Sequence, residues 1–156
     1  MGKAIEIQSP NEFKKKSGYK SVFLAGSIEM GEAEDWQKEI IDSLEDENIM
    51  FLNPRRDDWD STWKQEKTDK NFKEQVTWEL TALEFADYIA LYIDPNTQAR
   101  ITLLELGLHA RNGKLIVCCP KGFDRKGNID ITCDLYGVQQ VDTLEELIEA
   151  IKKKVN

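Results

Sequence analysis

A glutamate within an otherwise apolar stretch is the first residue whose surroundings indicate chemistry. Glu105 lies in Ile101-Thr-Leu-Leu-Glu-Leu-Gly-Leu-His109, where its neighbours are almost all aliphatic. We expect it in the first turn of a helix, where apolar surroundings desolvate the carboxylate and the helix dipole helps to keep it ionised. These conditions suit a nucleophile. The spacing Thr102-x-x-Glu105 also fits a capping box, in which Glu105 only satisfies the backbone N–H of Thr102.

Glu79 is the second carboxylate of interest. It follows Val76 by three residues and precedes Leu83 by four, so it shares the apolar face of an expected helix. Glutamate is rarely buried without a partner or a task, which favours a functional role. The alternative is a residue at the edge of the apolar stripe whose tip reaches water or an arginine. Asp87, which opens an expected strand, either supports the same site or only forms the helix-to-strand turn.

Gly26 and Ser27 end the first apolar strand of the chain. Glycine at this position allows a ligand to approach the backbone, and the following N–H groups with the Ser27 hydroxyl can hold a hydroxyl or a phosphate. The segment is not a P-loop, because no Gly-Lys-Ser/Thr follows it.

Two arginines follow the next apolar strand, in Asn53-Pro54-Arg55-Arg56. In an acidic protein, arginines at a strand end indicate contact with a phosphate or a carboxylate. The alternative is local pairing with the aspartates that come next, which are Asp57, Asp58 and Asp60.

The long polar stretch 53–71 carries two tryptophans, and a third follows in the next helix. Loops of this length are uncommon in compact domains and are often functional. Trp59, Trp63 and Trp78 are candidates for stacking on a nucleobase, and packing of the chain is the alternative for each.

Strands and helices alternate along the chain. Apolar runs bounded by Gly, Pro or Asn predict strands at 21–25, 49–52, 87–93, 115–119 and 138–141. Helical spacing of apolar residues predicts helices at 32–46, 72–85, 102–112 and 143–154. We expect Gly113 to adopt the left-handed conformation after the third helix, a glycine-bearing loop at 121–128, and a capping box at Thr143 and Glu146.

This alternation indicates a parallel sheet covered on both faces. We predict a flavodoxin-like α/β fold, a three-layer sandwich with a five-stranded, mostly parallel sheet in the order 2-1-3-4-5. The whole chain, 1–156, is expected to form one domain with its core at about 20–142. Ligands bind beyond the carboxyl ends of such strands, which selects residues 26–27, 53–56, 94–102 and the segment from 120 onward.

Composition narrows the function classes. The 156 residues carry a net charge of −8, which disfavours long nucleic acid as a partner. No apolar run reaches the length of a membrane span, and the polar segment 1–20 is unlike a secretory signal, so we expect a cytoplasmic protein. Three cysteines and one histidine have no familiar zinc spacing, and we predict neither metal nor cofactor.

Taken together, these segments resemble the nucleoside 2-deoxyribosyltransferase-like family over roughly residues 20–142. The order and spacing of the matching pieces carry the resemblance, and these pieces are Phe23-Leu-Ala-Gly-Ser-Ile28, Asn53-Pro-Arg-Arg56 with Trp59-Asp60, Gln75-Val-Thr-Trp-Glu79, Ala86-Asp87 and Ile101-Thr-Leu-Leu-Glu-Leu-Gly107. The chain differs from the better-known transferases in its long 53–71 segment and in lacking a glycine-rich approach to Glu105.

The resemblance implies a role for each matching residue. Glu105 corresponds to the nucleophile and Glu79 to an acidic residue that contacts the base. Gly26 and Ser27 correspond to the loop that approaches the sugar. The remaining predicted substrate-binding residues are Asn53, Arg55, Trp59, Asp60 and Asp87. Family members often borrow a residue from a neighbouring subunit, which implies a homo-oligomer.

The hypothesis is therefore cleavage of the N-glycosidic bond of a (deoxy)nucleoside or its 5′-monophosphate. Glu105 would form a covalent glycosyl intermediate, and the sugar would pass to another base or to water. Transfer and hydrolysis share the first step, and the sequence does not separate them. Two alternatives from other classes are a nucleotide-sequestering module, in which Glu105 only caps its helix, and a flavin-binding electron carrier.

Overall fold

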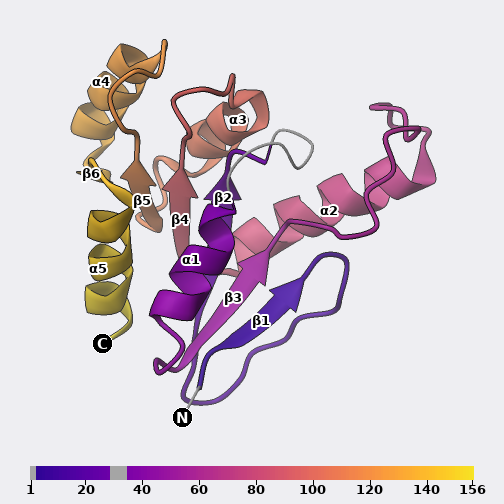
Figure 1. The fold of residues 1–156 in the computed structure, drawn as a ribbon, viewed down its shortest axis with the longest axis horizontal. Coiled ribbons are helices and arrows are strands. Elements are labelled where there is room, and N and C mark those ends of the chain that lie inside the picture. Colours follow the sequence, from indigo (N-terminus) through magenta and orange to yellow (C-terminus); the bar gives the residue numbers. More distant parts are fainter. Residues whose placement is uncertain (1–2, 29–34) are drawn as a thin grey trace.

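Six strands form a single parallel sheet (Figure 1). The structure is a computed structural model, and it describes residues 3–28 and 35–156. The strand order is β1-β3-β2-β4-β5-β6, and every neighbouring pair is parallel. The strands are β1 (Ile5–Gln8), β2 (Lys20–Gly26), β3 (Ile49–Asn53), β4 (Tyr88–Tyr92), β5 (Leu115–Cys118) and β6 (Gln139–Val141).

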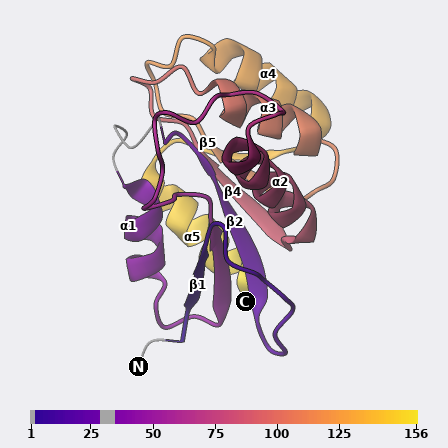
Figure 2. The same cartoon turned by 90° about the vertical axis from the view of Figure 1, so that its right-hand side faces the viewer.

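Helices cover both faces of this sheet (Figure 2). One face carries α1 (Trp36–Ser43) and α5 (Leu144–Val155), and the other carries α2 (Lys70–Phe85), α3 (Arg100–His109) and α4 (Lys126–Tyr136). No helix among the described residues is both long enough and apolar enough to cross a membrane.

The two layers of helices bury two separate cores. Phe23 and Ala25 of β2 face the core beneath α2, α3 and α4, whereas Val22 and Leu24 face the core beneath α1 and α5. All four side chains are fully buried. Because β2 is covered on both faces, its sequence is a continuous apolar run rather than an alternating one.

The predicted fold class and order are confirmed, since 2-1-3-4-5 corresponds to β3-β2-β4-β5-β6. The predicted strand count of five is wrong, because β1 adds a sixth strand that pairs only with β3 at the edge. Its sequence, Ile5-Glu-Ile-Gln8, alternates apolar and polar residues inside a polar segment. An edge strand that is only half buried has a weak sequence signal.

The helix boundaries also differ from those predicted. α4 was missed, and it begins at Lys126 inside the stretch 121–128 that was predicted to be a loop; it buries only Ile129 and Cys133. The predicted start of the first helix, 32–34, lies outside the described residues. The C-terminal helix is confirmed, with the capping box at Thr143 formed as predicted.

Candidate active site

A cavity of about 1100 Å³ opens at the carboxyl edge of the sheet. Pockets that enclose small ligands have volumes of roughly 300–1,000 Å³, so a nucleoside-sized molecule fits. Seven of the nine predicted site residues line the cavity, and these are Gly26, Ser27, Asn53, Arg55, Trp59, Glu79 and Glu105. The topology therefore brings the ends of β2 and β3 against α2 and α3.

Glu105 lies in this cavity with only 5% of its surface exposed. α3 begins at Arg100, two residues earlier than predicted, so Glu105 is in the second turn of the helix rather than the first. The residue before α3 is Ala99, which has a φ of 50° and makes no side-chain capping bond. The capping-box alternative for Glu105 is therefore wrong, and capping does not explain why a buried glutamate stands here.

Burial governs the ionisation of both glutamates. Loss of water, reinforced by the charge of Glu79, raises the pKa of Glu105 to about 8. Burial raises the pKa of Glu79 to about 7, although a hydrogen bond from Gln75 acts in the opposite direction. The expectation that Glu105 stays ionised is not met, since burial and the charge of Glu79 raise its pKa. Two interacting carboxyl groups of this kind titrate as a pair and share one proton near neutral pH.

Gly26 is required by the packing around it. A Cβ atom built on Gly26 would collide with the backbone carbonyl oxygen of Tyr92 and would lie 2.5 Å from Cζ2 of Trp36. The indole N–H of Trp36 donates to the carbonyl of Ser27 at 3.0 Å, which holds the ring in this place. The glycine thus allows α1 to pack closely against the ends of β2 and β4.

The Ser27 hydroxyl ties two loops together. It lies 2.8 Å from Oγ1 of Thr97 and accepts the backbone N–H of Asp94 at 3.1 Å. Thr97 donates its own proton to the carbonyl of Asp94 at 2.8 Å, so Ser27 is the donor in the hydroxyl pair. The Ser27 hydroxyl, which was predicted to hold a ligand, therefore donates its proton within the protein and links the end of β2 to the loop after β4.

Asn53 and Arg55 build the wall of the cavity. The Asn53 amide donates to Oε2 of Glu6 at 2.8 Å, and its Oδ1 accepts the backbone N–H of Arg55 at 3.1 Å. The Nε of Arg55 donates to Oε1 of Gln37 at 2.9 Å and lies 3.4 Å from Oδ1 of Asp35. Residues at the start of α1 therefore hold the Arg55 charge beside the cavity.

Arg56 pairs with a nearby aspartate, which was the alternative to ligand contact in the sequence analysis. It binds Asp58 through two N–H groups, at 2.9 and 3.0 Å, and Glu74 through a third at 3.0 Å. Its guanidinium also lies over the ring of Trp63, which packs edge-on against Trp59. Arg56 thus fastens the long polar loop to α2, and Trp59 is the tryptophan that lines the cavity.

Two predicted site residues lie away from the cavity. Asp60 accepts the backbone N–H of Thr62 at 2.8 Å and its hydroxyl at 2.7 Å, which caps a turn of the loop. Asp87 precedes β4 at the amino end of the sheet, where it accepts the N–H and hydroxyl of Ser21. Asp87 therefore forms the helix-to-strand turn, the alternative given above, and links α2 to the sheet.

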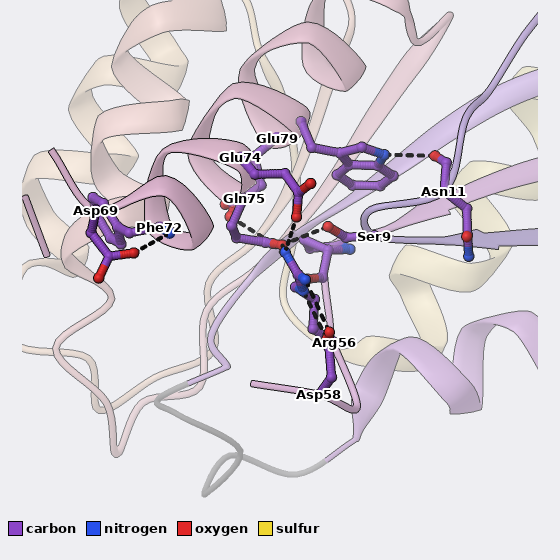
Figure 3. A network of polar contacts seen from close by, with 11 residues as sticks. Ser9, Asn11, Arg56, Asp58, Asp69, Phe72, Glu74, Gln75 and Glu79 are labelled. Atoms are coloured by element: carbon purple, nitrogen blue, oxygen red, sulfur yellow. Dashed lines mark hydrogen bonds and ion pairs between the residues drawn. The ribbon is translucent and has the colours of Figure 1, made fainter. Parts of the chain in front are cut away.

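Gln75 is the main residue of the site that the sequence analysis missed as a functional candidate. It is 4% exposed, lines the cavity and donates to Oε2 of Glu79 at 2.9 Å (Figure 3). The i, i+4 spacing of Gln75 and Glu79 on a predicted helix was the available signal. Within the described residues, no group of three or more His, Cys, Asp or Glu side chains is placed to hold a metal ion.

The fold and the cavity define a flavodoxin-like α/β protein with two carboxyl groups, those of Glu105 and Glu79, in its cavity. The chain belongs to the nucleoside 2-deoxyribosyltransferase-like family, which matches residues 19–123. A solved structure described as a conserved protein from Enterococcus faecalis has the same fold, with 15% identity, a TM-score of 0.64, and coverage of 88% of this chain and 99% of that one. No curated protein gives a significant match. Family membership supports a function of the glycosyl-transfer type.

Proposed function

We propose that the protein is an enzyme that cleaves the N-glycosidic bond of a (deoxy)nucleoside or its 5′-monophosphate. The observation that carries this proposal is a pair of carboxyl groups in one nucleoside-sized cavity, the buried Glu105 and the half-buried Glu79, each with a pKa raised by desolvation. Carboxyl pairs at a scissile glycosidic bond supply both the nucleophile and the acid of retaining glycosyl transfer. Membership of the family adds independent support for this reaction class.

The chemistry proceeds in two steps. As the C1′–N bond breaks, the Glu105 carboxylate attacks C1′ and forms a glycosyl ester, while Glu79 gives its proton to the leaving base. In the second step a new base or water attacks C1′, the ester bond breaks, Glu105 leaves as a carboxylate and Glu79 takes up the proton of the nucleophile. Two inversions give net retention at C1′, and one proton on the carboxyl pair suffices for the cycle.

This mechanism predicts a narrow bell-shaped dependence of kcat/KM on pH. Below about 7 both carboxyl groups hold protons, so Glu105 is not nucleophilic; above about 8 both are ionised, so the base receives no proton. The pair is therefore singly protonated between these values. Because Glu105 has the higher pKa, the proton lies mainly on Glu105 in the free protein, and the active form with the proton on Glu79 is the minor tautomer. Initial rates at low substrate concentration over pH 5–10 test this, and a flat profile across pH 6–9 would contradict a shared proton.

Base release is the direct test of the reaction class. Purified protein is incubated with a panel of deoxynucleosides, ribonucleosides and their monophosphates, with and without a second free base, and the products are separated by chromatography. We expect release or exchange of the base for at least one substrate. Exchange that needs the second base indicates transfer, and release without it indicates hydrolysis.

Arg55 is our candidate for contact with a 5′-phosphate. Its charge lies in the wall of the cavity that Trp59 also lines, and we propose that Trp59 stacks on the base. For Arg55→Ala we expect the KM of a monophosphate to rise about tenfold, while that of the matching nucleoside changes by less than about twofold. Added salt should weaken monophosphate binding in the wild type more than in the variant. An equal change for both substrates would remove Arg55 from phosphate binding.

A nucleotide-sequestering module remains the second candidate, and the raised pKa of Glu105 is the observation that favours it. A protonated Glu105 is a hydrogen-bond donor to a ligand, and donation needs no chemistry. Tight binding of a nucleotide, measured by calorimetry, together with no base release from any member of the panel would select this function.

We further propose that the protein acts as a cytoplasmic, single-domain subunit of a homo-oligomer. Along α3, Ile101, Leu104 and Leu108 are 60, 56 and 54% exposed and form a stripe at helical spacing, of which Ile101 and Leu104 also line the cavity. Exposed apolar patches of this kind indicate a binding surface. The stripe carries no charge, so two copies with a net charge of −8 each meet there with little repulsion.

A single charged residue on this stripe should therefore dissociate the oligomer. Leu108→Glu places a carboxylate at an exposed position outside the cavity lining, so the fold should be retained. We expect light scattering to give the mass of a monomer for this variant, and the wild-type mass for Lys153→Glu on the opposite face. A monomeric wild type, or an unchanged mass for Leu108→Glu, would rule out this interface.

A further inference from the structure

Gln75 connects Glu79 to two distant parts of the chain, the segment at Ser9 and the segment 54–56. Its Oε1 accepts the hydroxyl of Ser9 at 2.5 Å and an N–H of Arg56 at 3.4 Å (Figure 3). Its Nε2 donates to the carbonyl of Pro54 at 2.9 Å and to Oε2 of Glu79 at 2.9 Å. All the hydrogen-bonding atoms of this buried amide are therefore engaged.

The surroundings of Gln75 allow only one orientation of its amide. A guanidinium can only donate and a backbone carbonyl can only accept. Arg56 therefore faces the amide oxygen, and Pro54 faces the amide nitrogen. If the amide were flipped, its nitrogen would face the Arg56 donor and its oxygen would face the Pro54 carbonyl. Opposing like groups in this way at a buried site is costly. The N–H that faces Glu79 is consequently fixed whether or not Glu79 is ionised.

We propose that Gln75 is a positioning residue that sets which oxygen of Glu79 exchanges the proton with the nucleobase. The Gln75 N–H occupies Oε2, and a protonated carboxyl oxygen is the poorer acceptor, so the proton of Glu79 is carried on Oε1. Without this bond the carboxyl group would rotate and the proton would be shared between two directions. This inference rests on the function proposed above for Glu79 as the acid that serves the leaving base.

Part of the support for this arrangement comes from outside the matched family region. Ser9 follows β1 and precedes residue 19, where the family match begins. The same segment also contacts α2 through the indole N–H of Trp78, which donates to the carbonyl of Asn11 at 2.8 Å. The N-terminal strand and loop of this chain thus hold the helix face that carries both Gln75 and Glu79.

Replacing Gln75 with an uncharged residue leaves the charges around Glu79 unchanged. The charged groups that border the cavity from other elements include Glu105 and Arg100 of α3, Arg55 and Arg56 after β3, Asp35 before α1 and Glu6 of β1. Gln75→Met keeps all of them and preserves the length of the side chain, but removes the donor to Glu79. Ser9→Ala is the matched control, because Pro54 and Arg56 still orient the amide and its N–H is retained.

The test follows Glu79 itself, so it does not depend on turnover. Protein labelled with ¹³C at the glutamate carboxyl is titrated by NMR, and the Glu79 signal is assigned from its absence in Glu79→Gln. In Gln75→Met we expect the Glu79 midpoint to move upward by roughly one pH unit, because a hydrogen bond to the charged form is lost. In Ser9→Ala we expect the wild-type midpoint.

Kinetics then test the positioning role. In Gln75→Met the acidic limb of the kcat/KM profile should follow the NMR midpoint upward, and kcat should fall about tenfold or more with KM within about twofold. If Gln75→Met fails to fold, Gln75→Leu replaces it, since it is also uncharged and gives Glu79 no proton. An unmoved midpoint, or an equal movement in Ser9→Ala, overturns the proposal. A moved midpoint in a protein without turnover instead refutes the proposed function.

Discussion

Glu105→Gln should lower kcat by roughly 1000-fold or more, for transfer and for hydrolysis alike. The amide has nearly the shape of the carboxyl group, but it cannot form the glycosyl ester that both reactions need. We expect binding to survive, because the neutral amide resembles the protonated state of Glu105. The measurement is single-turnover release of the base, with binding followed separately by calorimetry. Glu149→Gln on the exposed side of α5 is the control, and its rate should equal that of the wild type.

The thermal stability of the same variant separates lost chemistry from lost structure. Burial raises the pKa of Glu105 from an ordinary 4.5 to about 8, so the folded state favours the protonated form. That contribution to stability is present at low pH and is lost as pH rises through about 8. Glutamine does not ionise, so the Tm of Glu105→Gln should equal or exceed that of the wild type, with the largest difference above pH 8. A lower Tm at pH 8 would contradict this account of the burial.

Gly26→Ala should destabilise the protein by about 2–3 kcal/mol, because the added methyl group meets a backbone carbonyl and an indole ring that is itself hydrogen-bonded. For a chain of this size that corresponds to a fall in Tm of about 4–12 °C. Thermal unfolding followed by circular dichroism gives the value. A loss of activity with an unchanged Tm would instead indicate that a ligand, and not the protein, needs the space at Gly26.

Gly127→Ala provides the matched control for this substitution. Gly127 lies within α4, and a Cβ built there has no heavy atom within 4 Å beyond its own helix and chain neighbours. Alanine is a better helix former than glycine, so this variant should gain up to about 1 kcal/mol. Opposite signs for the two glycines would show that the loss at Gly26 arises from its surroundings.

The central strands were predictable because burial on both faces leaves a local signal. Val22, Phe23 and Leu24 are adjacent apolar residues that divide between two cores, so no polar position interrupts them. β1 and α4 lack such a signal. β1 pairs on one side only, and α4 buries just two side chains while carrying a glycine near its start. Their structures depend on docking against the rest of the chain.

The start of α3 was mispredicted for a related reason. Thr102 and Glu105 have the spacing of a capping box, yet the helix begins after Ala99, a non-glycine residue with positive φ and no side-chain cap. Tertiary packing therefore sets this boundary, and Glu105 moves from a capping position into the cavity wall. The sequence analysis expected Glu105 to be a nucleophile because its neighbours are apolar, and the structure does bury it. The same burial, however, favours the protonated form of Glu105.

Side-chain pairing was predictable only where the partners are close in sequence. Arg56 and Asp58 are two residues apart, and their pairing was one of the two alternatives considered. The bonds from Ser27 to Thr97 and from Ser9 to Gln75 join residues separated by 70 and 66 positions. Such contacts depend on strand order and register, so a single sequence does not reveal whether a serine hydroxyl bonds within the protein or is free to bind a ligand.

Trapping the glycosyl intermediate tests the central claim most directly. A nucleoside with fluorine at C2′ destabilises the oxocarbenium-like transition states of both steps, so the ester on the enzyme should accumulate. We predict that intact-mass spectrometry shows one added fluorosugar, that peptide mapping places it on Glu105, and that Glu105→Gln carries none. Turnover of the ordinary substrate without any adduct on Glu105, or an adduct on another residue, would contradict the assignment of Glu105 as the nucleophile.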